Sequence, residues 1–169
     1  MTLAYRQRRH GENVAESSYT LLRRWEPANL IVVAFIGLNP STADETLDDP
    51  TIRRCIGFAK AWGAGGMYML NLFGWRSTDP AGLAAAEDPV GPENDAAIDR
   101  VLAREGPAAF AVACWGAHPS AKERGKVVAD RIARLRHVSC FGLTASGAPK
   151  HPLYLAKTTT LVTYVGGAR

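Results

Sequence analysis

Short apolar runs alternate with polar segments along the 169-residue chain. Four of these apolar segments are predicted strands, and the first is a continuous apolar, β-branched run of the kind that is buried on both faces in parallel sheets. They span 30–36, 67–73, 108–115 and 136–143. Between them lie three segments whose apolar positions recur at helical spacing. These span 50–62, 92–104 and 120–135.

This alternation predicts a single three-layer α/β domain, with a four-stranded, mostly parallel central sheet and helices on both faces. Weaker patterns suggest a first strand within 18–25, a short helix at 80–87 and a short extended segment at 161–165. Residues 1–17 are polar, contain three arginines and show no periodicity. We therefore expect a flexible basic tail at 1–17, followed by one domain over 18–169.

The composition is that of a soluble globular protein, with 47% hydrophobic and 21% charged residues. No apolar run approaches the roughly 18 residues of a membrane helix, and the N-terminus lacks the apolar core of a signal peptide. We expect a cytoplasmic protein. The three cysteines form no CxxC pair, which argues against a disulfide framework or a zinc site. A net charge of +4 permits a polyanionic partner without requiring one.

Polar residues follow several of the predicted strands. They are Asn39, Asn71, His118 and His151. In parallel α/β sheets, ligands bind outside the carboxyl ends of the strands. We therefore expect these four residues, which are remote in sequence, to approach one rim of the sheet.

Two asparagines are candidates for hydrogen bonding to a substrate. Asn39 lies in Gly37-Leu-Asn-Pro-Ser41, where a rigid loop would let its amide position a water molecule. The alternative is a simple Asn-Pro turn in which the amide bonds to its own backbone. Asn71 presents a donor and an acceptor side by side, which suits the edge of a flipped pyrimidine. Its alternative role is to close the end of a strand.

Histidines and aspartates supply the remaining candidates. His151, held by the following Pro152, could donate a hydrogen bond to charge developing on a leaving group. For His118 we favour a structural role. Asp44, Asp48 and Asp49 could hold Mg²⁺, although Asp48 and Asp49 are also placed to cap the helix that begins at Pro50.

Taken together, these motifs resemble the uracil-DNA glycosylase superfamily. The resemblance rests on GLNPS at 37–41, MLN at 69–71, ACWGAH at 113–118 and KHPL at 150–153. At the level of the whole sequence, the chain resembles more closely a bacterial family known as domain of unknown function 1643 (DUF1643). The segments that carry this second resemblance are LNPSTAD, DDPTIRRC, NLFGWRSTDP, GPENDA and HPLYL.

The glycosylase resemblance implies a monomeric enzyme that flips a damaged, mismatched or modified base out of DNA and hydrolyses its N-glycosidic bond, without a cofactor or metal. Asn39 and His151 would be catalytic; Asn39 would only orient water, because an amide cannot accept a proton as a general base. The substrate would contact Gly37, Leu38, Pro40, Ser41, Asn71, Phe73 and Pro152. DNA phosphates would contact Arg53, Arg54, Lys60 and Lys150.

Two other functions fit the same residues. One is a non-catalytic module that binds a nucleotide or nucleic acid on the same fold. The other is a metal-dependent phosphohydrolase built on Asp44, Asp48 and Asp49 with His118 or His151. It would lose activity in EDTA, whereas a glycosylase would not.

Overall fold

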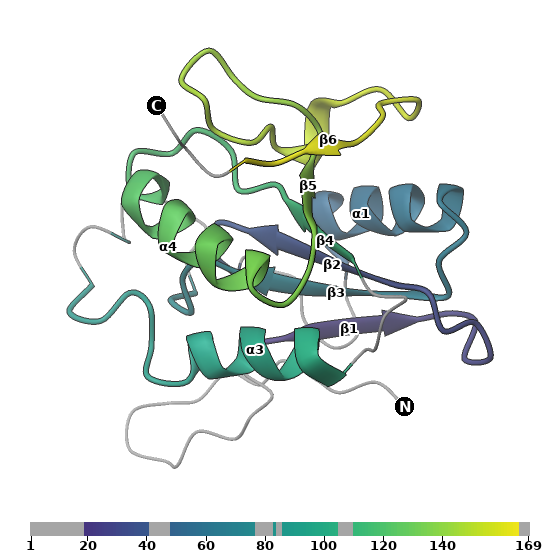
Figure 1. Ribbon diagram of the computed structural model, residues 1–169, viewed down its shortest axis with the longest axis horizontal. Coiled ribbons are helices and arrows are strands. Elements are labelled where there is room, and N and C mark those ends of the chain that lie inside the picture. Colours follow the sequence, from purple (N-terminus) through teal and green to yellow (C-terminus); the bar gives the residue numbers. More distant parts are fainter. Residues whose placement is uncertain (1–18, 41–47, 77–82, 84–85, 105–109, 166–169) are drawn as a thin grey trace.

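The computed structural model describes residues 19–40, 48–76, 83, 86–104 and 110–165 (Figure 1). The predicted tail at 1–17 and most of the helix predicted at 80–87 lie outside these residues. The elements are β1 (Leu21–Arg24), β2 (Val32–Gly37), α1 (Pro50–Ala61), β3 (Gly66–Asn71), α3 (Asn94–Arg104), β4 (Phe110–Ala113), α4 (Ala121–Ala133), β5 (Val138–Cys140), the 3-10 turn η2 (Pro152–Tyr154) and β6 (Val162–Thr163). Within the described ranges, none of the helices has the length and apolar character needed to cross a membrane.

The strands form one sheet in the order β1-β3-β2-β4-β5-β6. The pairings of β3 with β2, β2 with β4, and β4 with β5 are parallel. The two outer pairings, β1 with β3 and β5 with β6, are antiparallel. The prediction of a four-stranded, mostly parallel sheet like that of the uracil-DNA glycosylases is therefore wrong, because the described residues form a six-stranded mixed sheet. The outer strands are short, and β6 is exposed on both faces, so their apolar pattern is weak.

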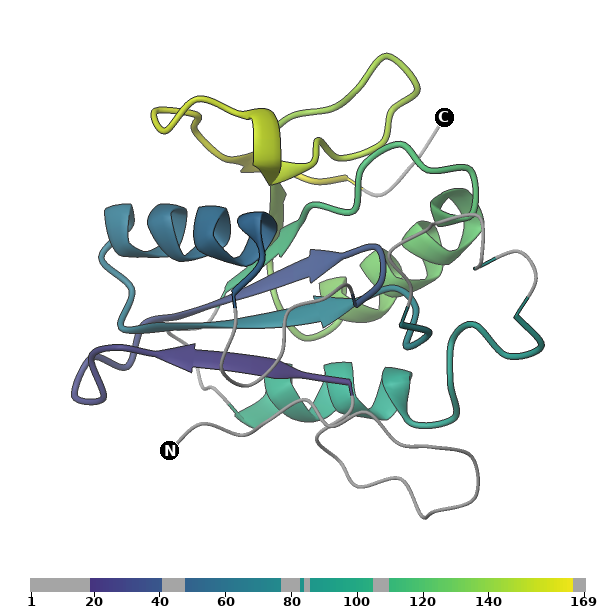
Figure 2. The ribbon, with the colours of Figure 1, turned by 180° about the vertical axis from the view of Figure 1, so that it is seen from behind.

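Helices lie against both faces of this sheet, with α1 on one face and α3 and α4 on the other (Figures 1 and 2). Alternate residues of β2 point to opposite faces. Val33 and Phe35 pack in the cluster that includes Phe58 of α1. Ala34 and Ile36 pack in the cluster that includes Ile98 of α3. Both cores are thus centred on β2, and this fixes the position of its carboxyl end.

The two faces of the sheet differ in the contacts that their helical layers make besides the apolar cores. On the α1 face, aromatic rings pack together, with the Phe58 and Phe141 centroids 4.6 Å apart. On the other face, ion pairs join α3 to α4, including Arg131 to Asp99 at 2.8 Å. A second pair joins Arg124 to Asp95, and this hydrogen bond lowers the pKa of the Asp95 carboxyl.

Candidate site at the carboxyl edge of the sheet

The ends of β2 and β3 meet at Gly37 and Asn71, which are paired in register. The pairing continues past the strands, because the amide of Leu72 donates to the Gly37 carbonyl at 2.9 Å. A Cβ atom on Gly37 would lie 2.8 Å from Oδ1 of Asn71. The glycine therefore makes room for the Asn71 carboxamide, which lies against the backbone of the neighbouring strand.

The Asn71 side chain is nearly buried and has no partner among the residues that the structure describes. The residue is 6% exposed, and its carboxamide makes no hydrogen bond to any described residue. Its polar atoms are not among the fully buried, unpaired side-chain atoms of the described residues, which are Nε of Arg54 and Nε of Arg136. The Asn71 carboxamide is therefore a candidate for hydrogen bonding to a ligand at the strand end.

Asn94, at the start of α3, fixes the backbone around Asn71. Its side-chain nitrogen donates to the backbone carbonyls of Asn71 and Leu72, both at 3.0 Å. Nε of Arg124 also donates to the Leu72 carbonyl, at 2.9 Å. These contacts fix the backbone of the segment after β3. They do not use the Asn71 carboxamide.

Asn39 lies two residues beyond Gly37 and is half-buried. Its side-chain nitrogen donates to the carbonyl oxygen of Pro40 at 3.2 Å. The amide is thus held by its own loop, which is the alternative role considered for this residue. Asn39 and Asn71 both belong to the carboxyl edge.

His151 immediately precedes η2, and its ring is oriented by that turn. Nδ1 accepts a hydrogen bond from the Leu153 amide at 3.3 Å. In the neutral ring, the proton is then on Nε2, which is a donor. The His151 Cβ lies 3.5 Å from the position that a Cβ on Gly116 would occupy, so the turn packs against the segment after β4. Burial lowers the pKa of His151 from its ordinary value of 6.5, and the charge of Asp49 opposes that shift.

The carboxylate of Asp49 lies close enough to the His151 ring for its charge to affect the His151 pKa. It caps α1 by accepting a hydrogen bond from the Ile52 amide at 2.7 Å. The N-terminal end of α1 lies beside η2 in both views (Figures 1 and 2). The guanidinium of Arg54 joins the two elements by donating to the Leu155 carbonyl. Asp49 is thus held near His151, although no direct hydrogen bond between these two described residues is present.

The other aspartates do not assemble a metal site within the described chain. The carboxylate of Asp48 pairs with Arg23 at 2.8 Å. The described residues contain no group of three or more potential metal ligands among histidine, cysteine, aspartate and glutamate. Asp44 lies outside the described residues.

The predicted DNA contacts are spread over two edges of the sheet. Arg53 donates to the Asp48 carbonyl, and Arg54 is engaged by Leu155. Lys150 is exposed near Gly142, at the carboxyl edge. Lys60 lies in the last turn of α1, 5.3 Å from the Trp25 ring. A helix of that length places Lys60 roughly 15 Å from Asp49.

The remaining predicted substrate contacts are mainly packing residues. Phe73 and Pro152 are buried, as is Pro40, and Leu38 is half-buried against the core of the α3 and α4 face. Ser41 lies outside the described residues. Of the predicted set, Gly37, Asn39, Asn71 and His151 lie at the carboxyl edge.

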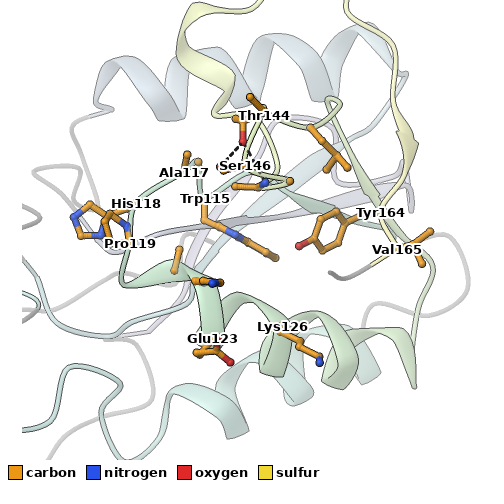
Figure 3. Close-up of a pocket in the computed structure, with 17 residues that line it drawn as sticks. Trp115, Ala117, His118, Pro119, Glu123, Lys126, Thr144, Ser146, Tyr164 and Val165 are labelled. Atoms are coloured by element: carbon orange, nitrogen blue, oxygen red, sulfur yellow. Dashed lines mark hydrogen bonds between the residues drawn. The ribbon is translucent and has the colours of Figure 1, made fainter. Parts of the chain in front are cut away.

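A pocket is lined in part by Gly116, and we call it the α4 pocket (Figure 3). Its volume is about 850 Å³, and its walls come from 115–119, the first half of α4, the loop 143–148 and residues 164–165. The Trp115 and Tyr164 rings meet edge to face at 5.5 Å. His118 lies at the rim, where its Nδ1 accepts a hydrogen bond from the Ser120 amide, in keeping with the structural role favoured for it.

Sequence reasoning missed two contributors to this edge. It names Asp49, both as a helix cap and as a metal ligand with His118 or His151, and the packing of α1 against η2 is what brings Asp49 near His151. Asn94 lies within the GPENDA segment, which marks the family but does not by itself indicate a contact. Arg124 has the appearance of a solvated helix residue, and only the fold places it against Leu72.

The fold and this edge define an α/β protein with a polar site outside the carboxyl ends of adjacent parallel strands. The family model described as "Protein of unknown function (DUF1643)" matches residues 18–153, and the chain belongs to this family. This match says nothing about uracil-DNA glycosylase motifs. No curated protein and no solved structure matches the chain.

Proposed function

We propose that this protein is a DNA base glycosylase that hydrolyses the N-glycosidic bond of a damaged, mismatched or modified pyrimidine flipped out of DNA. The observation that carries the proposal is the Asn71 carboxamide, which is nearly buried and makes no hydrogen bond to a described residue. A carboxamide offers one acceptor and two donors in a plane. The edge of a pyrimidine carries complementary groups, and enzymes that flip bases recognise them by such hydrogen bonds.

His151 supports the chemical step. Its lowered pKa keeps the ring neutral at neutral pH, and Nδ1 is occupied by Leu153, so Nε2–H is the available donor. As the bond from C1′ to the base breaks, the electron pair leaves with the base. A fixed donor aimed at that developing charge stabilises the transition state without reorganisation.

The sugar side of the reaction requires negative charge and a nucleophile. Asp49 would stabilise the positive charge that develops at C1′ and would receive a proton as water forms the new bond to C1′. The base anion takes a proton from solvent, so water is consumed and an abasic sugar and a free base are produced. Asn39 would orient that water through its carboxamide.

The experiment is an assay for base release. The protein is incubated with oligonucleotides that carry uracil, thymine mismatches, hypoxanthine or hypermodified pyrimidines, and alkali then cleaves the strand at abasic sites. We expect strand cleavage for at least one pyrimidine substrate, with and without EDTA. If a folded protein gives no abasic product from any of these substrates, the proposed function is wrong.

The second candidate function is a non-catalytic module that binds a nucleotide or nucleic acid. The hydrogen bond from Asn39 to Pro40 favours it, because that bond gives the Asn39 amide a structural role in its own turn. This candidate predicts saturable binding of the same oligonucleotides, dependent on Asn71, with no abasic product.

A further inference from the structure

The α4 pocket is separate from the edge that holds Asn71 and His151, and the proposed reaction does not use it. Gly116 separates the two, since it lines the pocket and also packs against the Cβ side of His151. Gly116 follows β4, and Asn71 ends β3, with β2 between them in the sheet. Two strand spacings amount to about 10 Å. A flexible polymer could therefore occupy both places at once.

The walls of the pocket combine an aromatic part with a charged side, which carries Lys122, Lys126 and the carboxylate of Glu123. Trp115 and Tyr164 project toward each other from two segments, and Lys126 lies across from them on α4 (Figure 3). Lys122 lies one turn before Lys126, so both face the same side of the helix. Both lysines are exposed, and no described carboxylate lies within ion-pair distance of either.

These features suit a nucleotide better than they suit an inorganic ion or a wholly apolar ligand. Ligand pockets typically measure roughly 300–1,000 Å³, and a volume of about 850 Å³ is far larger than a single anion requires. Tyr164 is half-buried and offers its ring to a base or sugar, while Trp115, which is 3% exposed, supports that ring edge to face. The two lysines offer charge to a phosphate. The hydroxyls of Thr144 and Ser146, 2.9 Å apart, lie on the opposite wall.

We propose that the α4 pocket holds a nucleotide that flanks the flipped one, in a single DNA strand that passes over Gly116, with Lys122 and Lys126 binding its phosphates. This inference rests on the proposed function in one respect only, namely that the nucleotide held at Asn71 is the one whose base is removed. The pocket would give the enzyme affinity for the strand independently of the base that it removes.

The test is the salt dependence of binding to fluorescein-labelled decathymidylate, measured by fluorescence anisotropy. The test variant is Lys122→Gln with Lys126→Gln. The matched control is Arg100→Gln with Arg134→Gln, which removes the same charge from exposed positions in α3 and at the C-terminal end of α4. Thermal melting checks that both variants fold. We expect the slope of log affinity against log salt to fall by about 1.4 in the test variant, which is roughly 0.7 for each of the two phosphates, and to stay unchanged in the control.

Equal slopes in the test and control variants, or no binding of decathymidylate by the unaltered protein, would overturn the inference. A third result would also overturn the inference: thymidine monophosphate competes fully with decathymidylate, and the salt slope does not depend on the length of the strand. The pocket would then be a site for a free nucleotide. Base release is assayed in parallel. A reduced slope without any base release would leave the pocket inference standing and reject the proposed enzyme.

Discussion

Asn71 and Asn94 are both buried, and their side chains are used in opposite ways. Asn94 is 1% exposed and gives its nitrogen to two backbone carbonyls, while Asn71 is 6% exposed and its carboxamide is not bonded to a described residue. They are the only polar or charged residues that are buried within the described ranges. Asn94 has the contacts of a structural residue, whereas the proposed function assigns Asn71 to the recognition of a ligand.

This contrast distinguishes residues that stabilise the backbone at the carboxyl edge from residues that we propose bind a ligand. Asn94 and Arg124 donate hydrogen bonds to backbone carbonyls and so fix the backbone on which the proposed binding residues lie. His151 belongs with Asn71 in this respect. Its Nδ1 is used by the turn, and its Nε2–H is the donor left for a ligand. Four predictions test this separation.

The largest expected effect belongs to His151. Replacing it in His151→Gln removes the fixed donor to the departing base, and removing one such donor typically costs about 10²–10³ in rate. The single-turnover rate of base release measures this loss. Binding of decathymidylate serves as the control and should change little. A rate within a factor of two of the original would show that His151 does not assist the leaving group.

The next effect separates the two asparagines directly. Asn94→Leu leaves the Asn71 and Leu72 carbonyls without that donor and should cost about 1–3 kcal/mol of stability. Asn71→Leu removes no hydrogen bond to a described residue, so its stability should change by less than about 1 kcal/mol, while base release falls by at least about tenfold. Urea unfolding and the base-release assay measure the two effects. If Asn71→Leu were the less stable of the two variants, the contrast would be incorrect.

A smaller effect concerns pH. Burial lowers the pKa of His151, and the Asp49 charge partly offsets that shift. The folded His151 ring should therefore take up its proton only below about pH 6.5. Folding stability should fall on acidification in that range, because the unfolded chain takes up the proton first. Asp49→Asn should lower the His151 pKa further, because it removes the negative charge that opposes the effect of burial. The NMR titration of the His151 ring measures the pKa itself, and an unmoved pKa would mean that Asp49 and His151 do not interact.

The smallest effect compares two helical glycines. A Cβ on Gly125 of α4 would lie 2.9 Å from the Trp115 ring, whereas a Cβ on Gly57 of α1 would meet nothing within 4 Å. Gly125→Ala should destabilise the fold by about 1–2 kcal/mol, because overpacking a buried ring outweighs the gain in helix propensity. Gly57→Ala should stabilise it by about 0.5–1 kcal/mol. Thermal melting should show shifts of opposite sign, and a higher melting temperature for Gly125→Ala would contradict the packing of Trp115 on α4.

The central elements of the fold could be predicted from sequence, because they consist of continuous apolar runs. The run at 30–36 became β2, and the helix after Pro50 became α1, with Asp49 as its cap. The predicted four-stranded sheet did not include the two outer strands. Strand β1 has only four residues and β6 has two exposed ones, so neither has enough apolar periodicity to reveal its pairing.

The candidate site was predictable as a set of polar residues after strand ends, but its details were not. The surroundings of the Asn71 side chain depend on Asn94, on Gly37 and on the register of β2 with β3. That Nδ1 of His151 is occupied depends on the turn at Leu153. Each is a tertiary contact or a local geometry that residue type and spacing leave undetermined.

The role of Asn71 in reading the base is tested most sharply by measuring base release from the original protein and from Asn71→Leu side by side, on the same panel of modified and mismatched oligonucleotides. We expect alkali-labile sites at one or more pyrimidine substrates with the original protein. With the variant, we expect release to be slower by at least about tenfold while the stability of the fold is retained. Release by Asn71→Leu at the original rate would contradict the proposal that this carboxamide recognises the base.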